Sequence, residues 1–177
     1  MKSQITIKKI QDFLIKGVQT IYVDDDTSRR MWWASLEVIQ KDFLSQDCKQ
    51  GIWVASPLPV FNDKKFFNNF HGWLWSPEGF PYFQNANAGF LPVNNSDKIK
   101  KDYDLVSNYK VLNLSQKDGY EPFLMIITPN FQCILSIVGE KDKKSLLIKC
   151  DEESLKISIE LMHAKLNCLL YTSPSPR

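Results

Sequence analysis

Apolar residues recur every three or four positions in three segments of the chain, and each segment predicts an amphipathic helix. The first covers residues 5–21, the second covers residues 27–44, and the third follows Asp151 near the end of the chain. Three acids, Asp24-Asp25-Asp26, stand directly before the second segment. Because the helix dipole favours negative charge at a helix N-terminus, we interpret this triplet as a cap in preference to a metal site.

Strand-like patterns occur between the helices, as short apolar or alternating runs bounded by turn residues. They lie at residues 51–56, 71–76, 109–114, 123–128, 131–138 and 145–149. The last three are joined by short connections, which predicts an antiparallel meander with a charged turn at residues 139–144. Residues 62–70 favour a short helix, and residues 77–107, rich in Pro, Gly, Asn and Asp, favour an irregular insert.

This order of elements predicts an α+β domain. We expect a mainly antiparallel sheet of about five strands, flanked by two N-terminal helices and one C-terminal helix. The general form is similar to that of PAS and GAF sensory domains, which is an analogy of shape alone. The composition agrees with one globular domain, since 44% of the 177 residues are hydrophobic and 24% are charged.

The last ten residues, CLLYTSPSPR, match the translation of a common transposase sequencing adapter in one reading frame. We therefore interpret residues 168–177 as an adapter-derived tail and residues 1–167 as a single domain. The natural protein is then expected to continue past Asn167. Three cysteines remain without the tail, namely Cys48, Cys133 and Cys150. An odd number of cysteines and no signal-peptide pattern predict reduced thiols in a cytoplasmic protein.

Motifs for catalysis, for phosphate binding and for metal coordination are absent from the sequence. We therefore predict no catalytic residues, no metal site and no cofactor. The 22 basic residues are nearly balanced by 20 acidic ones, which argues against nucleic acid as a partner. No run approaches the roughly 18 apolar residues of a membrane span, which argues against a membrane partner.

Aromatic residues are dense in the first half of the chain, where all five tryptophans lie between residues 32 and 75. One interpretation is a core built around a small sheet, because each such side chain buries a large apolar area. The other is an aromatic pocket for a small molecule, with a few polar groups among apolar walls. The candidate ligand-binding residues are Trp53, Ser56, His71, Trp73 and Trp75.

Two stretches carry a family resemblance: RRMWWASLE at residues 29–37, and GIWVASPLP at residues 51–59 followed by FHGWLW at residues 70–75. Together they resemble the N-terminal sensory region of cyanobacterial sensor histidine kinases, in particular the DICT-like input domain. The resemblance implies a signal-input domain of a two-component system, with the kinase domain lying beyond Asn167. The chain as it stands would then not be an enzyme.

A sensor of this kind needs an element that a signal can bias between two states. We assign transmission to the C-terminal helix, whose apolar stripe is Leu155, Ile159, Met162 and Leu166. The expected partners are a small-molecule ligand, the downstream kinase domain of the intact chain, and a second copy of the chain through this helix. Two alternatives stay open: a protein–protein interaction module without a ligand and, less favoured, an enzyme of unrecognised type.

Overall fold

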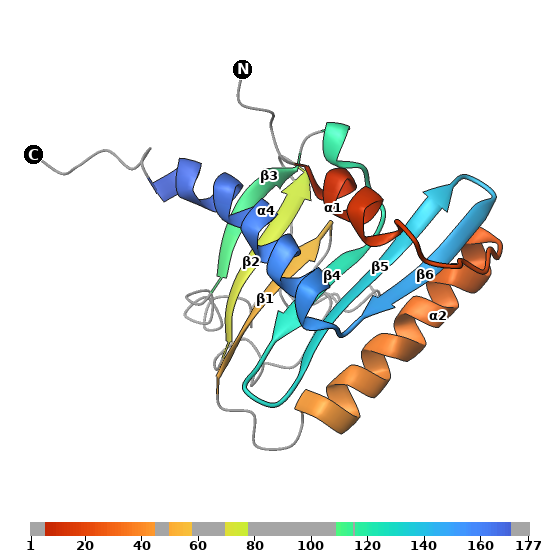
Figure 1. The fold of residues 1–177 in the computed structure, drawn as a ribbon, viewed down its shortest axis with the longest axis horizontal. Helices are drawn as coiled ribbons and strands as arrows, with labels where there is room; N and C mark the ends of the chain where they lie inside the picture. Colours follow the sequence, from red (N-terminus) through yellow and green to blue (C-terminus); the bar gives the residue numbers. More distant parts are fainter. Residues whose placement is uncertain (1–5, 45–49, 58–69, 78–108, 115, 171–177) are drawn as a thin grey trace, which may run out of the picture.

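The computed structural model describes residues 6–44, 50–57, 70–77, 109–114 and 116–170. These residues form an α+β domain around one six-stranded sheet (Figure 1). The helical elements are α1 (Ile7–Leu14), α2 (Asp25–Val38), the π-helical turn η1 (Ile39–Leu44), the 3-10 turn η4 (Gln116–Asp118) and α4 (Glu152–Leu170). The strands are β1 (Gly51–Ser56), β2 (Phe70–Pro77), β3 (Tyr109–Leu114), β4 (Phe123–Ile127), β5 (Gln132–Glu140) and β6 (Lys143–Lys149).

The sheet is mixed, and its strand order is β3-β2-β1-β4-β5-β6. β1, β2 and β3 run parallel, whereas β4, β5 and β6 form the predicted antiparallel meander. The prediction of a mainly antiparallel sheet of about five strands is therefore wrong. Parallel neighbours need a connection of a dozen or more residues, and the chain offers such lengths after β1 and after β2. The apolar pattern of a sequence indicates where strands lie, but it does not indicate in which direction they run.

The two predictions made for those connections fall almost entirely on residues 58–69 and 78–108, outside the described part of the chain. Only their boundary residues can be compared. Phe70, predicted to end a helix, is the first residue of β2, and Pro77, predicted to open the insert, is the last.

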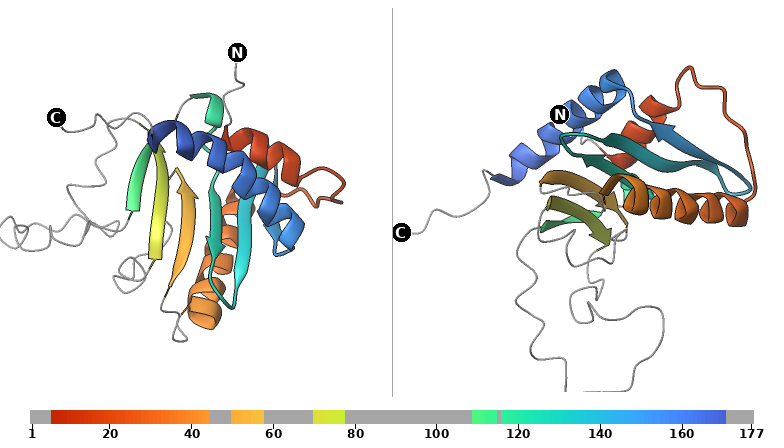
Figure 2. Two further views of the ribbon diagram at one scale, coloured as in Figure 1. Left: turned by 60° about the vertical axis from the view of Figure 1, so that its left-hand side comes forward. Right: turned by 90° about the horizontal axis from the view of Figure 1, so that it is seen from below.

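The helices lie on both faces of the sheet. Figure 2 shows α1 and α4 on one face and α2 on the other, so the predicted two N-terminal helices and one C-terminal helix are confirmed. Each face holds an apolar core. The α4-side core contains residues of α1, the sheet and α4, including Ile10, Trp75, Phe123, Met125, Leu155 and Met162. The α2-side core contains Trp32, Leu36 and Ile39 against Trp53, Phe70, Leu74, Leu124 and Leu135.

Both predicted N-terminal helices are present, with shifted ends. α1 stops at Leu14, seven residues before the predicted end, and the chain turns through Gly17 at a φ of 72°. α2 begins at Asp25, and three residues of the predicted apolar stripe, Trp32, Leu36 and Ile39, are buried, whereas the fourth, Phe43, is exposed. Asp24 caps α2, because its carboxylate accepts a hydrogen bond from the Thr27 backbone N–H at 2.8 Å. The capping interpretation of the acidic triplet is therefore confirmed.

Asp151 caps α4 in the same way, and the Oδ1 atom accepts a hydrogen bond from the Ser154 backbone N–H at 2.8 Å. This bond lowers the pKa of Asp151 below its ordinary value of 3.8. A lowered pKa in the folded state adds stability above the unfolded-state pKa, and that stability is lost as the pH falls through the folded-state pKa.

We therefore expect Asp151→Ala to cost about 1 kcal/mol at pH 7 through the lost cap. Asp151→Asn keeps an acceptor but does not titrate, so it should cost only a few tenths at pH 7. Urea unfolding between pH 2 and pH 7 measures the difference between the native protein and the Asn variant. Their stabilities should converge below about pH 4, and a constant difference across the range would contradict this prediction.

Candidate functional site

The candidate ligand-binding residues lie on β1 and β2, which are neighbouring parallel strands. Side chains alternate between the two faces of a strand, and the alternation separates the tryptophans. Trp53 belongs to the α2-side core, whereas Trp75 belongs to the α4-side core and Trp73 packs against that core. Trp73 and Trp75 therefore share a face, and Trp53 lies on the opposite side of the sheet.

The two polar candidates share the α4 side of the sheet by the same alternation, but they lie far apart along it. The Cα register pairs His71 with Ile52, whereas Ser56 stands four residues farther along β1. At about 3.3 Å per residue, this places the two polar residues roughly 13 Å apart along the strand direction. Ser56 is buried and His71 is exposed. The structure therefore brings Ser56 beside Trp75, and leaves His71 with Trp73 near the start of β2.

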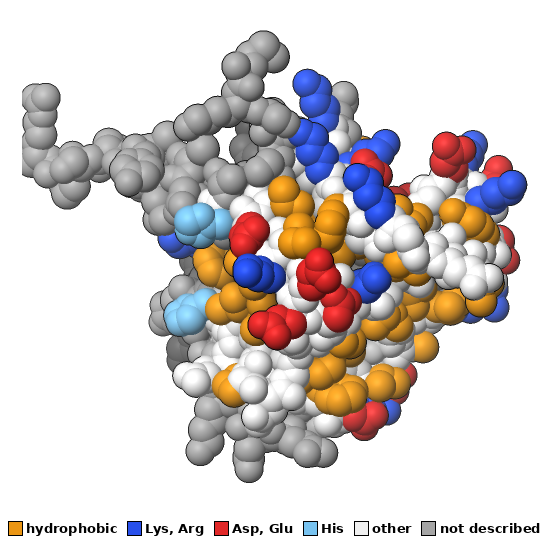
Figure 3. Space-filling model, in the orientation of Figure 1, with side chains coloured by type: hydrophobic (Ala, Val, Ile, Leu, Met, Phe, Trp, Pro, Cys, Tyr) orange, Lys and Arg blue, Asp and Glu red, His pale blue; other side chains and the backbone are white. Residues whose placement is uncertain are grey.

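The α4 side of β2 is the part of the predicted site that stays together. His71 is exposed, Trp73 is half-buried and Trp75 is buried, so the strand passes from solvent into the core within five residues. Both histidines of the chain are visible on this face, with apolar side chains between them (Figure 3). Small-molecule sites combine apolar and aromatic side chains with a few polar groups, and this face of β2 carries both kinds of side chain.

α4 covers the same face with a narrow buried stripe. Leu155 and Met162 are 2% and 1% exposed, and Ser158 between them is fully buried. The Ser158 hydroxyl donates a hydrogen bond of 2.7 Å to the backbone carbonyl of Ser154, within the helix. Of the remaining stripe residues, Ile159 points away from the core with 39% exposure, and the side chain of Leu166 lies outside the described part of the chain. The small Ser158 allows α4 to lie close to its neighbours.

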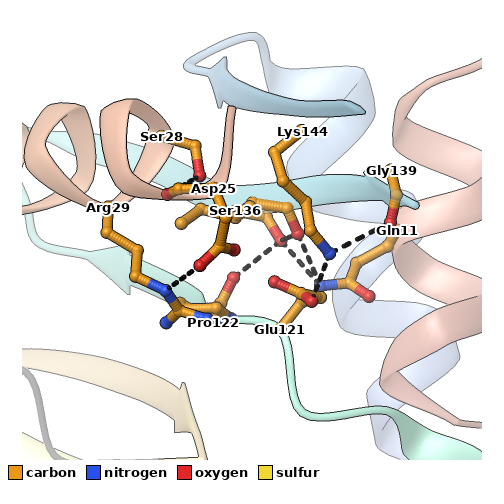
Figure 4. Close-up of polar contacts among 10 residues, drawn as sticks. Gln11, Asp25, Ser28, Arg29, Glu121, Pro122, Ser136, Gly139 and Lys144 are labelled. Carbon is orange, nitrogen blue, oxygen red and sulfur yellow. Dashed lines mark hydrogen bonds and ion pairs between the residues drawn. The ribbon is translucent and has the colours of Figure 1, made fainter. Parts of the chain in front are cut away.

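A polar cluster lies at the end of the sheet where β1 stops and β4 starts (Figure 4). The Lys144 ammonium pairs with the Glu121 carboxylate and donates a hydrogen bond of 3.3 Å to the carbonyl of Gly139. Gln11 of α1 donates to the Ser136 hydroxyl at 2.8 Å. The lysine side chain is only 6% exposed, so its charge relies on these contacts.

Sequence reasoning missed this cluster because residues 139–144 read as a charged turn. In the structure β5 continues to Glu140 and β6 begins at Lys143, so the turn is Lys141-Asp142 alone. The buried lysine could have been found by extending the alternation of β6 backwards from Leu146 to Lys144. This signal is weak, because most residues in that stretch are charged. The contacts of the cluster join α1 to β5 and β6, and we assign it a structural role.

No group of three or more His, Cys, Asp or Glu residues within the described residues is placed to hold a metal ion. Among the helices of the same residues, none combines the length and the apolar character needed to cross a membrane.

The described residues form a three-layer α+β domain (Figure 2), in which Trp75 of β2 and the C-terminal helix α4 share one core. A family model described as a domain of unknown function (DUF8628) matches residues 8–173, so the chain belongs to this family. The match includes residues 168–173, which the sequence analysis assigned to an adapter-derived tail. No curated protein matches the chain, and no solved structure matches it.

Proposed function

We propose that this chain is a signal-input domain of the DICT-like kind, which feeds a sensor histidine kinase located downstream in the intact cyanobacterial protein. The α4 side of β2, with His71, Trp73 and Trp75, takes up a small molecule, and α4 passes the change on. The observation that carries the proposal is a shared core: Trp75 of β2 and Leu155 and Met162 of α4 belong to one buried cluster. The likeness of form to PAS and GAF sensory domains is part of this proposal.

A shared core supports transmission because packed interiors do not deform continuously. A ligand that reorients Trp73 or Trp75 changes the surface on which the helix rests. Leu155, Ser158 and Met162 are all buried on the side of α4 that faces the sheet, so a change in the surface beneath them favours a shift of the helix. The ligand biases the two positions of the helix only by its difference in affinity for them.

The first experiment follows tryptophan emission of the chain against deproteinised fractions of a cyanobacterial extract. We expect at least one fraction to shift the emission, and His71→Ala and Trp73→Ala to weaken that response about tenfold or more. Trp33→Ala serves as the matched control, because Trp33 is an exposed tryptophan of α2 on the other side of the sheet. No response to any fraction, or an equal loss in all three variants, would contradict a small-molecule site on β2.

The second experiment recovers the natural gene past the codon for Asn167 and measures autophosphorylation of the complete protein. We expect an open frame that encodes a kinase domain. Leu155→Ala should reduce the ligand response severalfold, because it loosens the packing of α4 against the core. Lys156 is exposed on the same helix, so Lys156→Ala should leave the response unchanged. A stop codon in place of the kinase domain would rule out this function.

The homodimer expected through the C-terminal helix would use the outward side of α4, where Ile159 is exposed. Sedimentation of the complete protein and of its Ile159→Lys variant tests this part of the proposal. We expect the variant to dissociate at concentrations at which the native protein is dimeric, and identical sedimentation would contradict a dimer through this helix.

The alternative, an interaction module without a ligand, has its support on α2, where Met31, Trp33 and Val38 are all exposed. Exposed apolar side chains of this kind mark binding surfaces when they are contiguous. The extract experiment separates the two functions, because an interaction module responds to no small-molecule fraction.

A further inference from the structure

Two cysteines that are 17 positions apart in the sequence come together beside the start of α4. In the β5–β6 pairing, Ile134 stands opposite Lys149. Continuing this antiparallel register by one residue sets Cys133 opposite Cys150, the residue that follows β6. Both thiols are free. Cys133 is buried in the α2-side core, whereas Cys150 is exposed.

The position is suitable for a disulfide bond. Directly opposite residues of antiparallel strands have Cα atoms about 4.5–5.5 Å apart, and disulfides span Cα separations of about 4.4–6.8 Å. The two side chains also lie close enough to interact, because Cys150 adds to the effect of burial in raising the pKa of Cys133. Only a small approach of the two Cβ atoms is then required.

We propose that Cys133 and Cys150 form a dithiol modification site that low-molecular-weight disulfides, such as oxidised glutathione, convert into an intramolecular disulfide. Cys150 is the entry point because it is the exposed member of the pair, and Cys133 is the resolving thiol. The bond ties the residue next to the Asp151 cap of α4 to β5. This site does not rely on the proposed sensory function.

The steps balance as two thiol–disulfide exchanges. The Cys150 thiolate attacks one sulfur of oxidised glutathione, which forms a mixed disulfide and releases one glutathione thiolate. Cys133 then loses its proton to water and attacks the Cys150 sulfur, which releases the second glutathione. Two protein thiols are oxidised and one glutathione disulfide is reduced to two thiols.

Burial sets the order of these steps. Desolvation, with smaller contributions from Cys150, raises the pKa of Cys133 to about 12, so this thiol is a poor first nucleophile. Once Cys150 carries glutathione it holds no negative charge, and its repulsion of a Cys133 thiolate disappears. The second exchange is intramolecular, which compensates for a small thiolate fraction.

The test uses the full chain with Cys48→Ser and Cys168→Ser, which leaves Cys133 and Cys150 as the two remaining cysteines of four. After oxidised glutathione is added at low protein concentration, thiols counted under denaturing conditions should fall from two to zero. The monomer mass should fall by two hydrogen atoms, and dithiothreitol should reverse both changes. Peptide mapping should identify one linked pair, Cys133 with Cys150.

Two further variants test the order of attack. Cys133→Ala should stop at a stable glutathione adduct on Cys150, and Cys150→Ser should react at least tenfold more slowly, because only the buried thiol remains. If Cys133→Ala fails to fold, the Cys150→Ser rate still decides the question. A persistent glutathione adduct on Cys150 with a free Cys133 in the two-cysteine protein, or disulfide formation only between chains, would overturn the proposal.

Discussion

Replacing Gly72 with alanine is expected to destabilise the folded protein by about 3 kcal/mol, near the upper end of what overpacking one methyl group costs. A Cβ atom at this position would lie 2.1 Å from Cε2 and 2.3 Å from Cζ2 of Trp53. The indole therefore lies directly over Gly72. The ring cannot move aside, because Trp53 is 1% exposed and packs within the α2-side core.

A matched variant separates the clash from the mere loss of a glycine. Gly17 has a φ of +72° and open space where a Cβ atom would stand, so Gly17→Ala should cost only about 1–2 kcal/mol for the left-handed backbone. Adding Trp53→Phe to Gly72→Ala should recover part of the stability relative to the sum of the single variants, because the smaller ring relieves the contact. Urea unfolding measures five proteins: the native protein, Gly17→Ala, Gly72→Ala, Trp53→Phe and the double variant. A Gly72→Ala loss no larger than that of Gly17→Ala would contradict the packing argument.

The contact belongs to a reciprocal arrangement that links β1 to β2. Trp53 of β1 covers Gly72 of β2, and Phe70 of β2 covers Gly51 of β1, where a Cβ atom would lie 2.4 Å from the Phe70 ring. The register pairs Gly51 with Phe70 and Trp53 with Gly72. Each large ring therefore fills the space left by a glycine on the neighbouring strand.

Local periodicity predicted the features that depend on neighbours in sequence. The buried stripe of α2, the cap at Asp24 and the meander of β4 to β6 all follow from spacing within one segment. The common face of Trp73 and Trp75 follows from alternation within one strand. These predictions needed no knowledge of which strand lies beside which.

The candidate site depended on pairings between segments, and there the sequence was insufficient. Trp53 and Trp73 appear equivalent in a list of aromatic residues, but the parallel register of β1 and β2 sends them to opposite faces. Cys150 is similar, because its neighbour Cys133 follows from the β5–β6 register and not from composition. The Phe43 ring of η1 stacks on Phe131 with centroids 4.3 Å apart, a contact that no helical period implies.

The burial of Lys144 is a further non-local outcome, and it leads to the second large prediction. Its partner Glu121 is 23 residues away, with a side chain that is 28% exposed, against 6% for the lysine. Removing one member of a buried pair leaves the other charge uncompensated, and the cost depends on how well water reaches it. Glu121→Leu should therefore cost about 3 kcal/mol. The buried Lys144 ammonium would keep its hydrogen bond to the Gly139 carbonyl but lose the negative charge that compensates it. Lys144→Met should cost about half as much, since the remaining Glu121 side chain is more exposed than that of the lysine.

The double variant shows whether the fold requires the ion pair itself, or only that neither charge is left buried without the other. Well-packed apolar replacements of a buried pair are often neutral, so Glu121→Leu with Lys144→Met should lie within about 1 kcal/mol of the native protein. Lys143→Met, at the exposed neighbouring position of β6, controls for the loss of a positive charge and should change stability by less than about 0.5 kcal/mol. Denaturant unfolding of the five proteins gives the coupling energy directly. If the two single losses simply add in the double variant, the ammonium and the carboxylate do not depend on each other, and the pairing argument for Lys144 is wrong.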